Sequence, residues 1–424
     1  MIARGRRRAV ARSWLVAAVL VVVSGTAAGQ EPVGGSCGAC HEAMPDERLS
    51  APAKLYATDV HAQRGFGCIA CHGGDTSAVG LEGMDPAKGF IGRPEGRTLL
   101  AVCGRCHSSA EFMRRYNPAL RVDQVAEYQS SVHGQRLVRY GDTLVATCRN
   151  CHPAHRVRPP SDPRSSVHPL NVSATCGACH GDAGRMRAYR IPTDQLEKYR
   201  RSVHFRMLAE QGDLSAPTCN DCHGNHGAAP PGVSWVGNVC GQCHAMMAEK
   251  FRLSRHAETF AAQGIPGCAA CHGNHEIQAA ANTMLGLGEG SVCARCHTAT
   301  DAGGRTAVVM RRLLDSLETR FGAAERLLRR AEEAGMEVSQ ARFELEGAQN
   351  ARVASRTAVH AFQLDSVRTE VVRGLEVSEA GVVAGERALA DLNFRRGGLA
   401  VSVAIIVALI AGLVLKIRQL ERRG

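Results

Sequence analysis

The chain has 424 residues, a formal net charge of +11, 18 cysteines and an aromatic content of only 4%. Five positive charges lie in residues 1–12 and a net three in the last 28 residues, so the region 30–300 carries only +3. A nucleic-acid-binding protein needs a basic surface on its folded body, whereas here the charge lies at the two ends. The distribution therefore excludes nucleic acid as an expected partner.

Residues 1–29 have the features of a secretory signal peptide. Five arginines lie within the first 12 residues, followed by an apolar centre at 14–23 and small residues at 26–29. An uncleaved N-terminal anchor is the alternative. Both interpretations send the following residues out of the cytoplasm.

The sequence Cys-x-x-Cys-His occurs nine times and uses every cysteine of the chain. Two thiols at this spacing can bond to the two vinyl groups of one haem, and the next residue then offers an imidazole to the iron. The pattern predicts nine covalently bound haem c groups. The attachment residues are Cys37, Cys40, Cys68, Cys71, Cys103, Cys106, Cys148, Cys151, Cys176, Cys179, Cys219, Cys222, Cys240, Cys243, Cys268, Cys271, Cys293 and Cys296. The predicted proximal iron ligands are His41, His72, His107, His152, His180, His223, His244, His272 and His297.

Two other uses of paired cysteines have to be weighed. Structural zinc sites use the Cys-x-x-Cys spacing, and exported proteins form disulfides. Zinc does not demand a histidine at the same adjacent position in every motif, and disulfides demand none. The regular histidine therefore favours haem.

Nine histidines lie outside the motifs, one for each predicted haem. From His61 onward they follow a repeat of four dihaem units: a leading histidine, a first motif that is often followed three residues later by a trailing histidine, and a second motif. A trailing histidine is too close in sequence to its own motif and is expected to bind a neighbouring haem. The motif at Cys37 stands alone before the units. The predicted sixth ligands are His61, His133, His155, His168, His204, His226, His256, His275 and His360.

Two of these histidines do not belong to the repeat. His168 closes a Ser-Val-His triplet, like His133 and His204, but lies outside the unit. His360 lies far beyond the last motif, in a helical region where a solvated histidine is the alternative. Without His360 one haem would remain five-coordinate and could bind substrate. Methionine is the competing sixth ligand and would raise a haem's potential, with Met44 near the first motif. The other methionines within the motif array are Met84, Met113, Met246 and Met247.

The region 30–300 is expected to be a nonahaem domain that is mainly α, with short helices, extensive loops and almost no sheet. Nine haems in so few residues leave too little chain for a side-chain core around each, so the porphyrins would supply much of the apolar interior. Glycine and proline interrupt the segments between the motifs.

Residues 301–396 are expected to form an antiparallel helical hairpin or bundle. Apolar residues recur at steps of three and four from Met310 to Ala331 and again from Val338 to Phe362, and a third helix is predicted over 365–394. The region contains 15 basic and 15 acidic residues. This balance favours a stalk, with a docking surface or oligomer interface as the alternative role.

The C-terminus is expected to anchor the chain in the inner membrane. Residues 397–415 are apolar and uncharged, which predicts a transmembrane helix over 397–416. The basic tail, 417–424, would lie in the cytoplasm because the body is exported and positive residues prefer that side. A buried helix of a soluble protein is the alternative.

The Ser-Val-His, CHGNH and CxxCH elements between Cys37 and His297 resemble those of the periplasmic multihaem cytochromes c of bacterial respiratory chains. The resemblance implies an electron carrier with bis-histidine haems between a quinol-oxidising membrane subunit and a periplasmic or outer-membrane acceptor. Multihaem nitrite reductases and hydroxylamine oxidoreductases share this architecture, so an oxidoreductase with one five-coordinate catalytic haem is the alternative. The nitrite reductase hallmark, lysine in place of a motif histidine, is absent because all nine motifs end in histidine.

Overall fold

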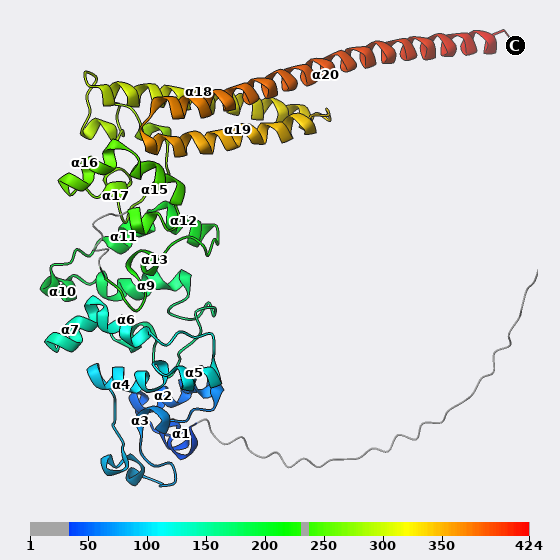
Figure 1. The fold of residues 1–424 in the computed structure, drawn as a ribbon. Helices are drawn as coiled ribbons and strands as arrows, with labels where there is room; N and C mark the ends of the chain where they lie inside the picture. The colour runs from blue at the N-terminus through cyan, green and yellow to red at the C-terminus, as the bar shows by residue number, and fades with distance from the viewer. Residues whose placement is uncertain (1–33, 230–236, 424) are drawn as a thin grey trace, which may run out of the picture. The chain divides into compact units, whose positions relative to one another are not determined.

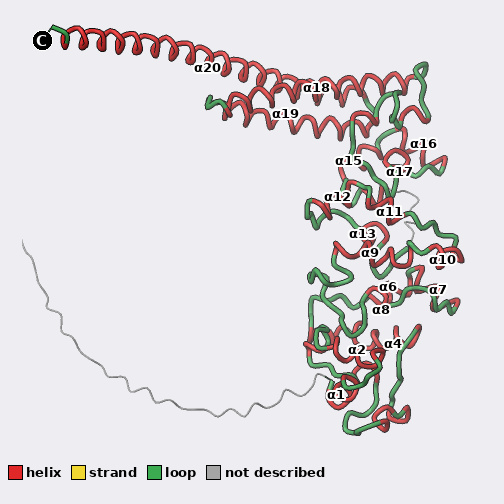
Figure 2. The backbone as a smooth tube through the Cα atoms, turned by 180° about the vertical axis from the view of Figure 1, so that it is seen from behind, coloured by secondary structure: helices red, strands yellow, loops and turns green. Residues whose placement is uncertain are grey.

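The computed structural model describes residues 34–229 and 237–423, and the predicted signal peptide at 1–29 lies outside them. The described residues form helices and loops without a strand (Figure 2), which confirms the mainly α prediction. The chain divides into two compact units, residues 1–93 and 94–424. The long helices begin with α18 at Ala302, close to the domain boundary that the sequence predicts after residue 300.

The first unit contains short helices and tight turns. Its elements are α1 (Gly35–Glu42), α2 (Glu47–Tyr56), η1 (Ala62–Arg64), α3 (Ile69–His72), η2 (Leu81–Met84) and η3 (Pro86–Lys88). After α3 the loop returns to the helix end, where the Ile91 backbone N–H donates to the His72 carbonyl at 2.9 Å. Gly73 permits this return because its φ is +67° and a Cβ there would lie 2.0 Å from the Gly89 carbonyl oxygen.

The part of the second unit that carries seven motifs, residues 94–300, is called the motif region below. It also consists of short helices (Figure 1). They are α4 (Gly96–His107), α5 (Ala110–Tyr116), α6 (Gln124–Ser130), α7 (Val132–Tyr140), α8 (Cys148–Cys151), α9 (Pro169–His180), α10 (Ala183–Met186), η4 (Arg187–Tyr189), α11 (Gln195–Arg200), α12 (Val203–Glu210), α13 (Cys219–His223), α14 (Gly237–Cys240), α15 (Ala245–Arg252), α16 (Arg255–Gln263), α17 (Gly267–His272), η5 (Asn282–Met284) and η6 (Cys293–Arg295). Several motifs form the last turn of a helix: His107, His180, His223 and His272 each end one.

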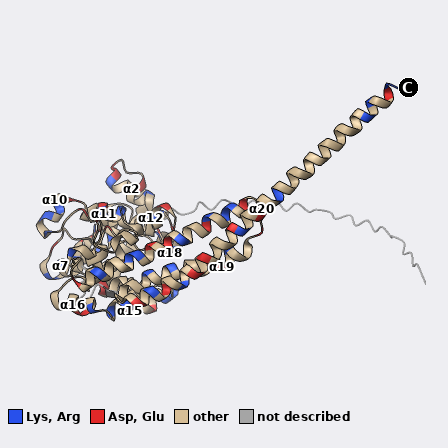
Figure 3. Cartoon of the chain, turned by 90° about the horizontal axis from the view of Figure 1, so that it is seen from above, with Lys and Arg blue, Asp and Glu red and all other residues tan. Residues whose placement is uncertain are grey.

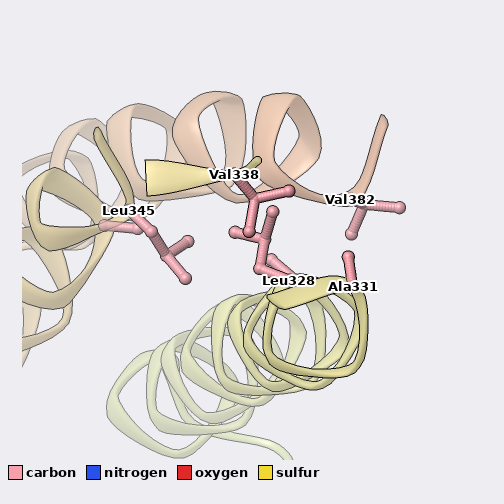
Figure 4. Close-up of a cluster of buried hydrophobic side chains, with 7 residues drawn as sticks. Leu328, Ala331, Val338, Leu345 and Val382 are labelled. Atoms are coloured by element: carbon pink, nitrogen blue, oxygen red, sulfur yellow. The ribbon is translucent and has the colours of Figure 1, made fainter. Parts of the chain in front are cut away.

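Three long helices form a bundle after the motif region. They are α18 (Ala302–Glu333), α19 (Ser339–Ala358) and the first part of α20 (Leu364–Glu421), with η7 (Val359–Ala361) before α20. Two hydrophobic clusters lie between them. One contains Leu328, Val338 and Val382 (Figure 4), and the other Met310, Leu317 and Val371. The bundle end with η7 joins the motif region, because α15 contacts α19 and η7 there.

The helix α20 continues without a break from the bundle through the apolar segment (Figure 1). Sequence analysis predicted two helices, 365–394 and 397–416, but the two glycines at 397 and 398 do not interrupt the helix. An 18-residue window of α20 has a mean hydropathy of 2.8 and is 0% buried. Figure 3 shows this segment without charged residues until its C-terminal end. A soluble protein would bury such a surface, so α20 fits a membrane span.

Candidate metal sites: six pairs of facing histidines

Twelve histidine rings of the second unit lie opposite one another in six pairs, called the facing pairs below. The ring centroids are 6.1 Å apart in His133–His180, 6.2 Å in His152–His226, 6.3 Å in His204–His244, 6.0 Å in His223–His275, 6.0 Å in His256–His297 and 6.1 Å in His272–His360. Every pair joins one motif histidine to one histidine outside the motifs.

The separation fits two imidazoles bound to one metal ion. A ligating nitrogen lies about 2.0 Å from a metal and about 1.15 Å from its own ring centroid, so two imidazoles on opposite sides of one ion have centroids about 6.3 Å apart. The angle between the rings varies from 12° to 77° across the six pairs, whereas the separation hardly changes. Two imidazoles that share one metal ion would have this combination, because a ring can turn about its metal–nitrogen bond but cannot change its distance.

The pairs follow a fixed order along the chain. A leading histidine faces the second motif of its own unit: His133 faces His180, His204 faces His244 and His256 faces His297. A trailing histidine faces the first motif of the preceding unit. Thus His226 faces His152, and His275 faces His223. The last unit has no unit after it, and His360 takes the place opposite His272.

The leading histidines are positioned by buried serines. The hydroxyls of Ser131, Ser202 and Ser254 accept hydrogen bonds from backbone N–H groups in the first turns of α7, α12 and α16, respectively. Each serine is therefore the N-cap of its helix, and the histidine two residues later is its second residue. A serine cap at one helix start and a motif at another helix end thus place two imidazoles opposite each other.

Hydrogen bonds at Nδ1 orient several rings. The Nδ1–H of His223 donates to the Ala229 carbonyl at 3.2 Å, and that of His360 to the Thr357 carbonyl at 3.2 Å. The Nδ1–H of His297 donates to the Asp301 carboxylate at 2.9 Å. A proton on Nδ1 leaves the Nε2 lone pair free for a metal. Sequence analysis missed Asp301, which also caps α18 and whose only sequence signal is its place before a long helix.

Hydrogen bonds at Nδ1 also orient two histidine rings of the first unit. The Nδ1–H of His72 donates to the Gly92 carbonyl at 2.7 Å. The Nδ1–H of His61 donates to the carboxylate of Asp59 at 2.8 Å, and Asp59 is only 1% exposed. Asp59 is a second orienting residue that sequence analysis did not assign. His41 lies in α1 and is half-buried, and its neighbour Cys40 is exposed.

Burial keeps most of the facing rings uncharged. It is the main cause that lowers the pKa of His133, His152, His180, His204, His226, His256, His272, His275 and His360. A second imidazole nearby lowers the pKa further in several of them, as His180 does for His133. The neutral ring is the form that binds a metal.

The thiols of consecutive motifs also lie close together. Hydrogen bonds join Cys103 to Cys148, Cys176 to Cys219 and Cys240 to Cys268, and they lower the pKa of Cys148, Cys219 and Cys240. In each case the first cysteine of one motif meets the first cysteine of the next. All 18 cysteines lie in the described residues, and no disulfide joins them there. Among the same residues no three Cys, His, Asp or Glu side chains converge as in a closed metal centre.

Three predicted site histidines of the second unit lie outside the six facing pairs. His107 ends α4, and His155 lies in the loop after α8 with a φ of +65°. His168 is buried, and its own side chain caps α9.

Comparison with protein families, characterised proteins and solved structures finds no match for this chain.

Proposed function

We propose that this chain is a membrane-anchored multihaem cytochrome c of the bacterial periplasm that carries electrons between a quinol-oxidising membrane subunit and a periplasmic or outer-membrane acceptor. The six facing pairs carry this proposal, because each joins a CxxCH histidine to a second histidine at a separation of 6.0–6.3 Å. Haem iron held by two imidazoles supplies a reversible one-electron centre.

The protein's contribution is to hold each site rigid. The two cysteines of a motif would bind the haem covalently, and the adjacent histidine and its facing partner would hold the iron between them. The hydrogen bonds at Nδ1 of His223, His297 and His360 would keep these three rings turned towards the metal, which limits rearrangement during electron transfer. A filled sixth position also excludes substrates, so these six sites favour electron transfer over catalysis.

Short segments link neighbouring sites into a path. His223 belongs to one facing pair and His226 to another, although three residues separate them. His272 and His275 are divided between two pairs in the same way. Ligands this close in sequence bring their two metal ions close in space. The thiol contacts between Cys176 and Cys219 and between Cys240 and Cys268 join further sites to this path, those of His180 and His244.

The continuous helix α20 supports an anchored position. Its apolar part would span the inner membrane, with the basic tail on the cytoplasmic side. About 50 Å of helix lies between Leu364 and the start of the apolar part at Gly397, at the usual rise per residue. The site at His272–His360 lies at the Leu364 end of the bundle. A quinol-oxidising partner would therefore have to extend along the bundle to deliver electrons there.

Spectroscopy of the full-length protein, produced with a cytochrome c maturation system, tests the proposal. The intact mass should show nine haems, and low-temperature EPR should show low-spin ferric haem at the six facing pairs. His226→Ala should convert one haem to the high-spin state, because its partner His152 would be left as the only axial ligand. Asn225→Ala, the adjacent control, should leave the spectrum unchanged.

Two results would contradict this function. One is a protein that matures without covalent haem. The other is a His226→Ala variant with the same number of low-spin haems as the parent. A separate experiment with membrane vesicles tests the proposed quinol-oxidising partner. A quinol should reduce the haems when the co-purifying membrane subunit is present and should not reduce them when that subunit has been removed.

A further inference from the structure

The geometry points to one haem site without a histidine on its distal side, the site at Cys37, Cys40 and His41. We infer that this site is open to a small neutral ligand of ferrous haem, such as carbon monoxide or nitric oxide. The inference rests on the proposed function, since it presupposes that haem is attached. If His360 were not a ligand, the haem at His272 would have the open position. The inference places the open position at the haem of the first motif instead.

His168 differs in position from the leading histidines that close similar triplets. In the triplets that end in His133, His204 and His256, the first residue is a serine that caps a helix. In the triplet at 166–168 the helix starts later, because Pro169 is its first residue and His168 is itself the N-cap. The Ser166 hydroxyl donates to the Cys151 carbonyl instead. The same three residue types therefore have a different local structure here.

A hydrogen bond places the proton of the His168 ring. Its Nδ1 accepts a hydrogen bond from the Leu170 backbone N–H at 3.3 Å. A neutral imidazole whose Nδ1 accepts carries its proton on Nε2, so neither nitrogen has a lone pair left for iron. His72, His223, His297 and His360 have the opposite arrangement, with Nδ1 as the donor. Within residues 94–229 and 237–423, no imidazole faces His168 at the separation of the six pairs.

The facing pairs follow one order in the three dihaem units that begin at His133, His204 and His256. Each of these units uses two donors, its own leading histidine and the trailing histidine of the next unit, with His360 in the trailing role for the last unit. We infer the same order for the unit that begins at His61, so that four units use eight donors, which are all the histidines outside the motifs except His168. The motif at Cys37 belongs to no unit. The order supplies no donor for it.

Within the compact unit 1–93, the surroundings of the first motif agree with an accessible site. Helix α1 is short and only Gly38 in it is buried, while Cys40 is exposed. The one histidine outside a motif in this unit is His61, a leading histidine held by Asp59. Met44 lies three residues after His41, which is the trailing position of a unit, and trailing residues face a different haem from that of their own motif.

The experiment uses the full-length haem-loaded protein. Low-temperature EPR and magnetic circular dichroism should show one high-spin ferric haem beside the low-spin ones, and the dithionite-reduced protein should bind a single carbon monoxide per chain. His168→Asn keeps an N-cap acceptor for α9 and should leave the high-spin count and the carbon monoxide uptake unchanged. The matched variant His360→Asn should add a second high-spin haem and a second bound carbon monoxide.

Three outcomes would overturn the inference. One is a parent protein with nine low-spin haems and no carbon monoxide binding. Another is a near-infrared dichroism band of methionine-ligated haem that disappears in Met44→Ala. The last is an additional high-spin haem in His168→Asn. None of these would contradict the proposed electron-transfer function, which fails only when haem is not attached or the facing pairs do not ligate.

Discussion

The motif region and the three-helix bundle are stabilised by different means, although they belong to one compact unit. Both hydrophobic clusters lie mainly in the bundle, where Leu317, Leu328 and Val371 are almost completely buried. In the motif region the buried apolar residues are scattered, for example Leu137 in α7 and Leu208 in α12. The bundle therefore contains the core that its own stability needs. The motif region positions three of its leading histidines with serine helix caps, and under the proposed function the haems would fill its interior.

The largest expected effect follows from withholding haem. Chain produced without a maturation system should lose most protection against amide hydrogen exchange in peptides from α6 to α17, because short helices without a core are not stable alone. Peptides from α18, α19 and the first part of α20 should remain protected. Hydrogen-exchange mass spectrometry of both preparations checks this. Equal protection of the motif region with and without haem would remove the contrast between the two regions.

A second effect tests where the two regions meet, at the site formed by His272 and His360. His360→Met replaces an imidazole with a thioether and should raise the potential of one haem by about 0.1 V or more, within the ~0.8 V range that axial ligands span. Gln363→Met places the same side chain at a nearby exposed position and should not change the redox titration. If a potentiometric titration of His360→Met shows that the potentials of all nine haems are unchanged, the bundle supplies no ligand.

Sequence reasoning identified the candidate ligands but not their pairing. The CxxCH spacing names each motif histidine directly, because the chemistry of attachment is local. Which histidine lies opposite depends on distant contacts, as between His152 and His226. His360 has no local pattern, and only the return of η7 towards α15 brings it to His272. For His168 a signal was present: Pro169 favours the first position of a helix and thereby makes His168 the cap.

The bundle was easier to predict, because an apolar period of three and four residues reports directly on a buried helix face. Met310, Leu314 and Leu317 follow this period and are buried. The end of the third helix was harder. The pattern changes near residue 396 from a buried face to an apolar surface on all sides, so the sequence predicts two separate helices, whereas α20 is continuous. The backbone hydrogen bonds continue through it because a helix satisfies its own polar groups in water and in lipid alike.

A smaller effect measures the bundle core itself. Leu317→Ala removes a side chain that is 1% exposed and packs against the second cluster, so it should lower the free energy of unfolding by about 2–5 kcal/mol. Phe343→Ala removes a larger side chain that is 68% exposed and should change it by less than about 0.5 kcal/mol. Thermal unfolding, followed by the helical circular dichroism signal, measures the free energy of unfolding of both variants. A similar loss for both variants would mean that Phe343 packs against something that covers α19.

The smallest effect compares two glycines, because the same substitution should have opposite signs at them. A Cβ at Gly374 would lie 2.8 Å from a Leu317 methyl and 2.9 Å from the Ala351 Cβ, so Gly374→Ala should destabilise the bundle by about 1–3 kcal/mol through overpacking. A Cβ at Gly347 would meet only Val377 methyls at 3.9 Å, which is ordinary contact. Gly347→Ala should therefore stabilise the helix by up to about 1 kcal/mol, the usual advantage of alanine over glycine. Denaturant unfolding of both variants gives the signs. Stabilisation by Gly374→Ala would show that α18 and α20 separate easily, and the bundle would then lack the tight core that distinguishes it from the motif region.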